Sequence, residues 1–166
     1  MLFQQTRIGK EGRPFTIYKF RTIPKGKSQS NAWGRLLRKT KLDELPQIIN
    51  LLKGEMTWVG PRPDVPGYAD QLKGEDRIIL TVKPGITGLA SLKYRNEEQL
   101  LAQQSNPLQY NDEVIWPDKV RINKWYVQNR SWKLDLIILA CTFFNLPLDV
   151  ETLIRKREYT KKKGAL

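Results

Sequence analysis

The sequence of 166 residues contains no histidine and a single cysteine. Without histidine there is no Ser-His-Asp triad, no histidine general base and no histidine-ligated metal. One cysteine excludes an internal disulfide and a cysteine-rich zinc site. Cys141 lies in the apolar run LDLIILACTFFNLPL, which predicts that its thiol is buried in packing. This cysteine usage is consistent with a reducing cytoplasm.

The sequence also lacks a signal peptide and a long hydrophobic run. The first residues, MLFQQTRIGKEG, have no apolar core. The longest apolar stretch, Leu134 to Leu148, carries Asp135 and Asn145 and is too short to span a bilayer. It can be a core helix or a helix lying in the membrane interface, and the sequence leaves both interpretations open.

Positive charge, in contrast, is abundant. The 29 Lys and Arg residues exceed the 17 Asp and Glu residues and give a net charge of +12. This excess points to an anionic partner, which can be nucleic acid, a membrane surface or a phosphorylated substrate. The hydrophobic fraction of 40% is typical of a folded chain. We expect one domain over 1–154 and a basic, frayed tail over 155–166.

Apolar and polar residues alternate over 14–23, which predicts a strand with Phe15, Ile17 and Phe20 on its buried side. A loop over 24–31, rich in Pro, Gly and Ser, follows the strand. The next segment, 32–39, is predicted to be a short basic helix.

A second helix is predicted after it, with Asp43 at its start, Pro46 in its first turn and Gly54 at its end. Its apolar residues recur at helical spacing and form one stripe: Leu42, Leu45, Ile48, Ile49 and Leu52. Further along, we expect a strand and then a Pro/Gly loop over 56–67, a helix over 68–80, a loop leading into a short strand over 81–95, a helix over 118–129, and a helix capped by Ser131.

Charged residues lie beside glycine or proline at four places, namely Lys19 with Arg21, Asp43 with Glu44, Arg62 within GPRP, and Lys83 and Arg95 around PGITG. The Asp43–Glu44 pair is the most informative, because the N-terminus of a helix favours negative charge. We expect these carboxylates to have depressed pKa values and to stay ionised. Such a carboxylate can hold Mg²⁺ or attack phosphorus. The alternative is that Asp43 is only an N-cap and Glu44 a first-turn acid.

The other charged positions also have two interpretations each. Arg62, between two prolines, can present a rigid guanidinium to a phosphate, or it can be a surface arginine in a turn. PGITG can let its backbone approach a ligand closely, or it can be an ordinary turn. Lys19 and Arg21 point to the same side of the predicted strand, where they can bind a diphosphate or form a solvated strand face.

Four segments together resemble the bacterial sugar transferase family, the monotopic phosphoglycosyl transferases. They are QQTRIGKEGRPFTIYKFRT (4–22), KLDELPQIINLLKGEMTWVGPRP (41–63), VKPGITGLASLKYR (82–95) and WYVQNRSWKLDLIIL (125–139). LDELPQ, GPRP and PGITG in this order and at these distances are highly specific, and the resemblance covers nearly the whole chain.

The resemblance implies a two-step reaction. Asp43 would attack the sugar-bearing phosphate of a UDP-sugar, UMP would leave, and a polyprenyl phosphate would take the phosphosugar from the aspartate. Glu44 would assist, with Mg²⁺ held by Asp43 and Glu44. The implied substrate-binding residues are Lys19, Arg21, Arg62 and Arg95.

The resemblance also implies a fold and a place in the cell. We expect an α/β (α+β) domain with a small antiparallel sheet surrounded by helices, some of them at the membrane interface. Family members carry a re-entrant membrane helix directly before the segment with which this sequence begins, so the sequence is interpreted as the catalytic domain without that helix. The implied partners are a UDP-sugar, a polyprenyl phosphate and an anionic membrane surface, with no nucleic acid, at the cytoplasmic face of the bacterial inner membrane.

Three positions depart from the family pattern. Ser91 stands where the family usually has glutamine, Asn123 where it has aspartate, and Tyr94 where it has glycine. These departures keep a second hypothesis open, a non-catalytic remnant of the fold that acts as an interaction module. A basic nucleic-acid-binding module would also explain the charge, but it gives no reason for the order of the motifs.

Overall fold

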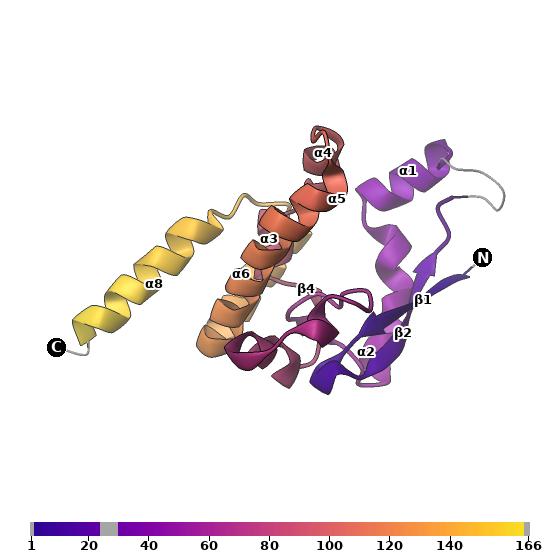
Figure 1. Cartoon of the computed structure of the whole chain (residues 1–166). Helices are drawn as coiled ribbons and strands as arrows, with labels where there is room; N and C mark the ends of the chain where they lie inside the picture. Colours follow the sequence, from indigo (N-terminus) through magenta and orange to yellow (C-terminus); the bar gives the residue numbers. More distant parts are fainter. Residues whose placement is uncertain (1, 24–29, 165–166) are drawn as a thin grey trace.

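The computed structural model describes residues 2–23 and 30–164, so most of the loop predicted over 24–31 lies outside the described residues. Figure 1 shows an N-terminal hairpin at one end of the molecule, a central group of helices and a C-terminal helix at the other end. The small sheets have two strands each and helices dominate, which confirms the predicted α/β class.

The hairpin consists of the antiparallel strands β1 (Leu2–Ile8) and β2 (Pro14–Phe20), joined by the 3₁₀ turn η1 (Lys10–Gly12). Ile17 is buried, as predicted, whereas Phe20 is exposed and the prediction for it was wrong. Successive side chains of a strand point to opposite faces, so Ile17 shares its inward face with Lys19. A lysine therefore points inward at the end of β2.

Helix α1 (Ala32–Lys39) has the predicted bounds and is capped by Asn31, whose side chain accepts a hydrogen bond from the Gly34 N–H at 2.8 Å. A Cβ atom at Gly34 would lie 2.1 Å from the Thr22 carbonyl oxygen. The absence of a side chain there thus lets α1 pack against the end of the hairpin.

The helix predicted from Leu42 onward is divided into a 3₁₀ segment, η2 (Leu42–Gln47), and helix α2 (Ile48–Leu52). Its buried residues are Pro46, Gln47 and Asn50, and the Asn50 amide donates to the Thr16 carbonyl and to Glu55 at 2.7 Å each. The apolar stripe faces outward, with exposed fractions of 44% at Leu42, 48% at Leu45, 45% at Ile48, 39% at Ile49 and 84% at Leu52. We call residues 42–52 the inside-out segment, because their polar groups face the protein and their apolar stripe faces outward.

Strands β3 (Thr57–Val59) and β4 (Gly85–Thr87) form a parallel pair, which the antiparallel prediction did not include. The GPRP and PGITG loops cross beside this pair at backbone contact. A Cβ atom at Gly88 would lie 2.2 Å from the Gly60 carbonyl oxygen, and one at Gly85 would lie 2.2 Å from the Gly60 nitrogen. The glycines of PGITG serve this crossing. The segment after β4 is helix α3 (Leu89–Lys93), not the expected strand.

The main core lies among α3, α6 (Trp116–Asn129), α7 (Trp132–Phe143) and β3. Cys141 is buried there, as predicted, and the Ser131 side chain caps α7 by accepting from the Leu134 N–H at 3.3 Å. The remaining short elements are η3 (Ala69–Gln71) and η4 (Gly74–Thr81), both 3₁₀ where a helix was predicted, together with α4 (Glu97–Ala102), α5 (Pro107–Tyr110) and the π-helical η5 (Asn111–Ile115).

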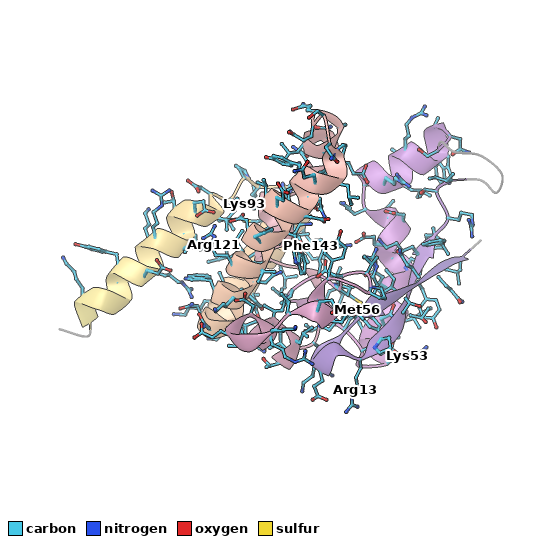
Figure 2. All side chains as sticks on the ribbon, viewed as in Figure 1. Arg13, Lys53, Met56, Lys93, Arg121 and Phe143 are labelled. Carbon is cyan, nitrogen blue, oxygen red and sulfur yellow. The ribbon has the colours of Figure 1, made fainter. Side chains whose placement is uncertain are left out.

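Helix α8 (Val150–Gly164) includes most of the segment expected to be a frayed tail. Its first turns are anchored by buried Val150 and Ile154. Figure 2 shows Lys93 and Arg121 where α8 approaches α6, and both cations bond to Glu151 of α8 and to Asp118 of α6. Within the described residues, no helix is long and apolar enough to cross a membrane.

Candidate active site

Glu44 is the centre of a network of charges contributed by three segments. Arg62 bonds to both of its carboxylate oxygens, at 2.7 Å from Nη2 and 3.0 Å from Nη1, and Lys19 Nζ lies 3.1 Å from Oε1. Burial acts to raise the pKa of Glu44, but Arg62 and Lys19 together hold it at about 2. Glu44 therefore stays ionised and ties the two cations together.

The backbone explains why these side chains meet. Lys19 points inward from β2. Glu44 lies in the first turn of η2, and this 3₁₀ segment begins directly after Lys41, which has a left-handed backbone (φ 58°). Arg62 follows β3 and donates a further hydrogen bond from Nη1 to the Ile86 carbonyl of β4 at 3.0 Å. The crossing of the two glycine loops thus fixes the position of the Arg62 guanidinium, which donates hydrogen bonds to Glu44.

Asp43 is chemically different from its neighbour. Its Oδ1 atom is buried and has no hydrogen-bond partner among the described residues. Burial, reinforced by the charge of Glu44, raises the pKa of Asp43, although Lys19 opposes the shift. The expected depressed pKa is thus found for Glu44 and is wrong for Asp43. Asp43 is also not an N-cap, because Lys41 holds the cap position of η2 and no side chain caps it.

Two of the predicted substrate-binding arginines make their contacts elsewhere. Arg21 lies beyond the end of β2, and its guanidinium carbon is 5.4 Å from the centre of the Phe3 ring. Arg95 donates to the Cys141 carbonyl at 3.0 Å and to the Asn145 side chain, at the end of α7. The structure brings Lys19, Glu44 and Arg62 together, and the binding roles of Arg21 and Arg95 stay predictions.

Sequence reasoning missed Arg7 and Asp64. Arg7 lies on the inward face of β1 and donates from Nη1 to the Pro63 carbonyl at 3.4 Å. Asp64 follows GPRP directly, and burial raises its pKa to about 6, while Lys119 and Arg7 act in the opposite direction. The alternation of β1 was the available signal for Arg7, whereas nothing in the sequence marked Asp64 as buried.

A divalent cation would find one free carboxylate in this arrangement. Both oxygens of Glu44 already accept hydrogen bonds from Lys19 and Arg62, so the unpartnered oxygen of Asp43 is the one that fits a cation. No group of three acidic, histidine or cysteine side chains that could hold a metal exists within the residues described. A magnesium ion bound through one carboxylate and substrate phosphates is compatible with this donor set.

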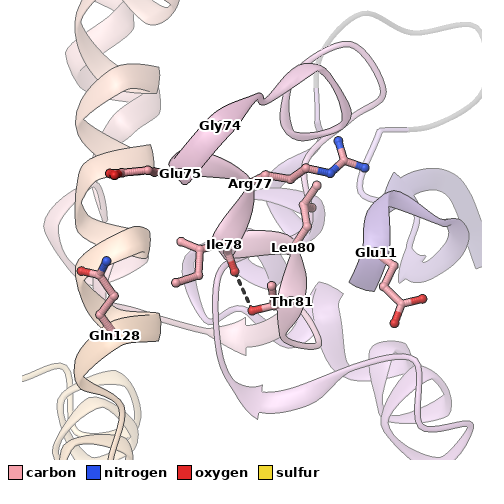
Figure 3. Close-up of a pocket in the computed structure, with 8 residues that line it drawn as sticks. All are labelled: Glu11, Gly74, Glu75, Arg77, Ile78, Leu80, Thr81 and Gln128. Atoms are coloured by element: carbon pink, nitrogen blue, oxygen red, sulfur yellow. Dashed lines mark hydrogen bonds between the residues drawn. The ribbon is translucent and has the colours of Figure 1, made fainter.

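A groove of about 720 Å³ lies elsewhere, between η4, η1 and α6, and none of the predicted site residues lines it. Figure 3 shows Glu11 and Arg77 on one side of it and Gln128 on the other, with the Thr81 hydroxyl bonded to the Ile78 carbonyl at 2.7 Å. Its open, mixed-charge walls offer no convergent chemistry, so we locate the site at the Asp43–Glu44 cluster.

Comparison with known proteins identifies the family. The protein-family model described as bacterial sugar transferase matches residues 1–148, which include every residue of the cluster. The chain belongs to the bacterial sugar transferase family.

Relatives of the chain include proteins named as sugar-phosphate transferases. The chain is 38% identical over 152 residues to the sugar transferase EpsL of Bacillus subtilis. This match covers 86% of this chain and 67% of EpsL. It is 32% identical over 157 residues to a UDP-N-acetylgalactosamine-undecaprenyl-phosphate N-acetylgalactosaminephosphotransferase of Aeromonas hydrophila, covering 86% of this chain and 34% of that protein. It is 33% identical over 160 residues to a UDP-glucose:undecaprenyl-phosphate glucose-1-phosphate transferase of Klebsiella pneumoniae, covering 87% and 32%. The chain thus spans two thirds of the first relative and about a third of the other two.

The three departures from the family pattern have structural settings of their own. Tyr94 donates its hydroxyl to Asp118 at 2.7 Å and so joins the network that anchors α8. Asn123 is buried on α6, and Ser91 is half-buried on α3. None of the three contacts Lys19, Glu44 or Arg62 through a hydrogen bond in the described part of the chain.

Proposed function

We propose that this chain transfers a sugar-1-phosphate from a UDP-sugar to a membrane polyprenyl phosphate, through a covalent phosphosugar on Asp43, with release of UMP, as the first step of bacterial glycan assembly. The observation that carries the proposal is the contrast between two adjacent carboxylates. Glu44 is bonded to Lys19 and Arg62, whereas the adjacent Asp43 has a buried oxygen without a hydrogen-bond partner among the residues described. The Aeromonas and Klebsiella relatives are named for UDP-sugar donors and an undecaprenyl-phosphate acceptor, which supports the substrate classes.

In the first step, an oxygen of ionised Asp43 attacks the sugar-bearing phosphorus. A bond forms between the Asp43 oxygen and phosphorus, and the bond from phosphorus to the bridging oxygen of the diphosphate breaks. UMP leaves and keeps the bridging oxygen. The raised pKa of Asp43 makes its oxygen more basic, and hence a better nucleophile, than an ordinary aspartate. Lys19 and Arg62 are placed to stabilise the charge on the transferring phosphate.

In the second step, a phosphate oxygen of the polyprenyl phosphate attacks the same phosphorus and Asp43 leaves. A dianionic donor and an aspartate give a monoanionic acyl phosphate and dianionic UMP. A dianionic acceptor then gives the dianionic product and regenerates the aspartate. Charge balances in both steps without a proton transfer, so neither step requires a histidine, and the sequence has none.

Magnesium, if it is the cofactor, would be held by Asp43 together with substrate phosphates and would neutralise their charge. Glu44 would then act through Lys19 and Arg62, because its own oxygens accept hydrogen bonds from these side chains. Removal of divalent cations with a chelator, followed by restoration with Mg²⁺, tests the cofactor separately from the nucleophile.

The test is UMP release from a panel of UDP-sugars in the presence of polyprenyl phosphate and Mg²⁺. Asp43→Asn should abolish release, with a loss of at least about a thousandfold, because the amide is not a nucleophile. Single-turnover reactions without acceptor should leave the phosphosugar on the wild-type chain, as detected by intact-protein mass. Folded wild-type protein that releases no UMP would instead favour the non-catalytic interaction module.

We also propose that the inside-out segment and α8 place this chain on an anionic membrane, at the cytoplasmic face of the inner membrane. The stripe of η2 and α2 is exposed, as are Phe143 at 73% and Phe144 at 75%. Helix α8 adds a basic surface with Arg155 and Lys156, which anionic headgroups attract. The nucleophile lies on the same inside-out segment, so the acceptor's phosphate would meet it at the membrane surface.

A further inference from the structure

Arg7 is a cation near Glu44 that no carboxylate of the described residues neutralises by contact. Its Nη2 atom donates to the Gln5 side chain at 2.8 Å and its Nη1 atom to the Pro63 carbonyl, and both acceptors are neutral. Its Nε atom is buried and has no hydrogen-bond partner among the residues that the structure describes. Among the described residues, no carboxylate oxygen lies within 4.0 Å of its guanidinium, whereas Glu44 lies within that distance of the Lys19 ammonium and of the Arg62 guanidinium.

The surroundings of Arg7 leave its charge only partly compensated. Burial lowers the pKa of Arg7, and Asp64 and Glu44 oppose this from a distance while Arg62 adds to it. A guanidinium nevertheless stays protonated in a protein. A desolvated cation without a contacting carboxylate is stabilised when an anion binds beside it.

Position and geometry define which anion fits. Arg7 shares the inward face of the hairpin with Lys19 and contacts the loop that carries Arg62. Its coupling to both Glu44 and Arg62 places it in the same charged layer as the candidate nucleophile. A guanidinium presents a planar fork that matches the oxygens of a phosphate.

We propose that Arg7 binds a phosphate group of one of the two substrates, as the uncommitted cation of the site. The inference rests on the proposed function for the identity of these substrates, the diphosphate of the UDP-sugar or the phosphate of the polyprenyl acceptor. In the free protein Lys19 and Arg62 already have Glu44 as a counter-ion, whereas Arg7 gains a counter-ion in contact only when a substrate binds.

Asp64 allows a test in which two substitutions change phosphate affinity in opposite directions. It is the negative group that acts most strongly on Arg7, so it would compete with a bound phosphate for that charge. Replacement of Arg7 should weaken phosphate binding, while Asp64→Asn should strengthen it. Because the pKa of Asp64 is raised to about 6, its ionised form is unfavourable in the native state above that pH. Asp64→Asn is therefore expected to keep the protein folded at pH 7.5.

The experiment measures the dissociation constant of inorganic pyrophosphate by calorimetry at pH 7.5 on the full chain. Arg7→Gln should weaken binding by about tenfold or more, Arg7→Lys by less, and Asp64→Asn should tighten it by about threefold. The matched control is Arg13→Gln, because Arg13 is exposed at the hairpin turn, pairs with Glu11 and points away from the molecule in Figure 2. It should bind pyrophosphate like the wild type.

The KM values of the same variants then identify the substrate. A rise for the UDP-sugar assigns Arg7 to the donor, and a rise for polyprenyl phosphate assigns it to the acceptor. Pyrophosphate affinity within twofold of wild type in Arg7→Gln, or shifts of the same sign in Arg7→Gln and Asp64→Asn, overturns the proposal. If Arg7→Gln does not fold, Arg7→Lys and Asp64→Asn decide by the same criteria. UMP release by the wild-type chain tests the proposed function independently of these affinities.

Discussion

The pKa values of the adjacent residues Asp43 and Glu44 shift in opposite directions, because only Glu44 contacts the cations of the site. Glu44 forms ion pairs with Arg62 and Lys19 and is ionised down to a pH of about 2. Asp43 receives little of that compensation, so burial dominates and its pKa rises. A pair of acids that looks equivalent in the sequence is thereby divided into an anchor and a free carboxylate.

The acidic limb of the pH–rate profile should report Asp43. A nucleophile must be deprotonated, so activity is lost as pH falls through its pKa. Because that pKa is raised, kcat/KM should decline at a pH above the ordinary aspartate value of about 3.9. Glu44 stays charged throughout this range. UMP release from pH 4 to 8, with circular dichroism as the folding control, makes the measurement. A rate that stays constant down to pH 4 would contradict the assignment of Asp43.

At the scale of elements, the site depends on two loops that pack without side chains between them. Gly60 and Gly88 meet at their backbones, and the crossing fixes Arg62, which bonds to Ile86 of β4. The contact joins positions far apart in the sequence, so it has to be kept by tertiary packing.

Gly88→Ala should therefore displace Arg62 and disrupt the site, although Gly88 itself is not a site residue. Its Cβ would lie 2.2 Å from the Gly60 carbonyl oxygen, a backbone atom that cannot move alone. We expect a loss of about 2 kcal/mol or more in the free energy of unfolding and a strong loss of UMP release. The control is Gly67→Ala, where open space surrounds the position and only a positive φ of 100° adds local strain. Denaturant titration and the activity assay compare the two, and equal losses in both would refute the crossing as the cause.

Local patterns predicted the elements that depend on local residues. The bounds of α1, the cap at Ser131 and the burial of Ile17 followed from spacing and from capping chemistry. Periodicity could locate the stripe beginning at Leu42, but it cannot tell which environment covers an apolar face. The 3₁₀ form of η2 and the parallel pair β3–β4 depend on packing that no local window contains.

For the site, the sequence identified Lys19, Glu44 and Arg62, which the structure joins. It could not separate Asp43 from Glu44, because the difference arises from two distant cations. Arg21 was placed beside Lys19 by strand alternation, yet β2 ends at Phe20 and the arginine turns to Phe3. Arg7 and Asp64 depend on the GPRP loop reaching β1, a contact between residues 56 apart.

At the scale of the whole molecule, the proposed membrane placement predicts that the apolar stripe is the surface in contact with lipid. Leu52→Asn should weaken binding to vesicles that contain anionic lipid by about thirtyfold, because burial of a leucine side chain stabilises by about 2 kcal/mol. Leu108→Asn is the control, since Leu108 is exposed at 67% on α5, away from α2 in Figure 1. Co-sedimentation at two salt concentrations separates this apolar term from the charge of α8. Equal effects of both substitutions would rule out the stripe as the docking face.

The inside-out segment has a kinetic consequence for the second step. Asp43 lies in the first turn of that segment, so a stripe seated in the lipid would hold the loaded aspartate at a fixed depth. The acceptor would then be found by lateral diffusion in a plane, and the relevant concentration would be molecules per unit area. Diluting the membrane with neutral lipid would slow phosphosugar transfer in proportion, whereas diluting the aqueous phase would slow only the loading of Asp43.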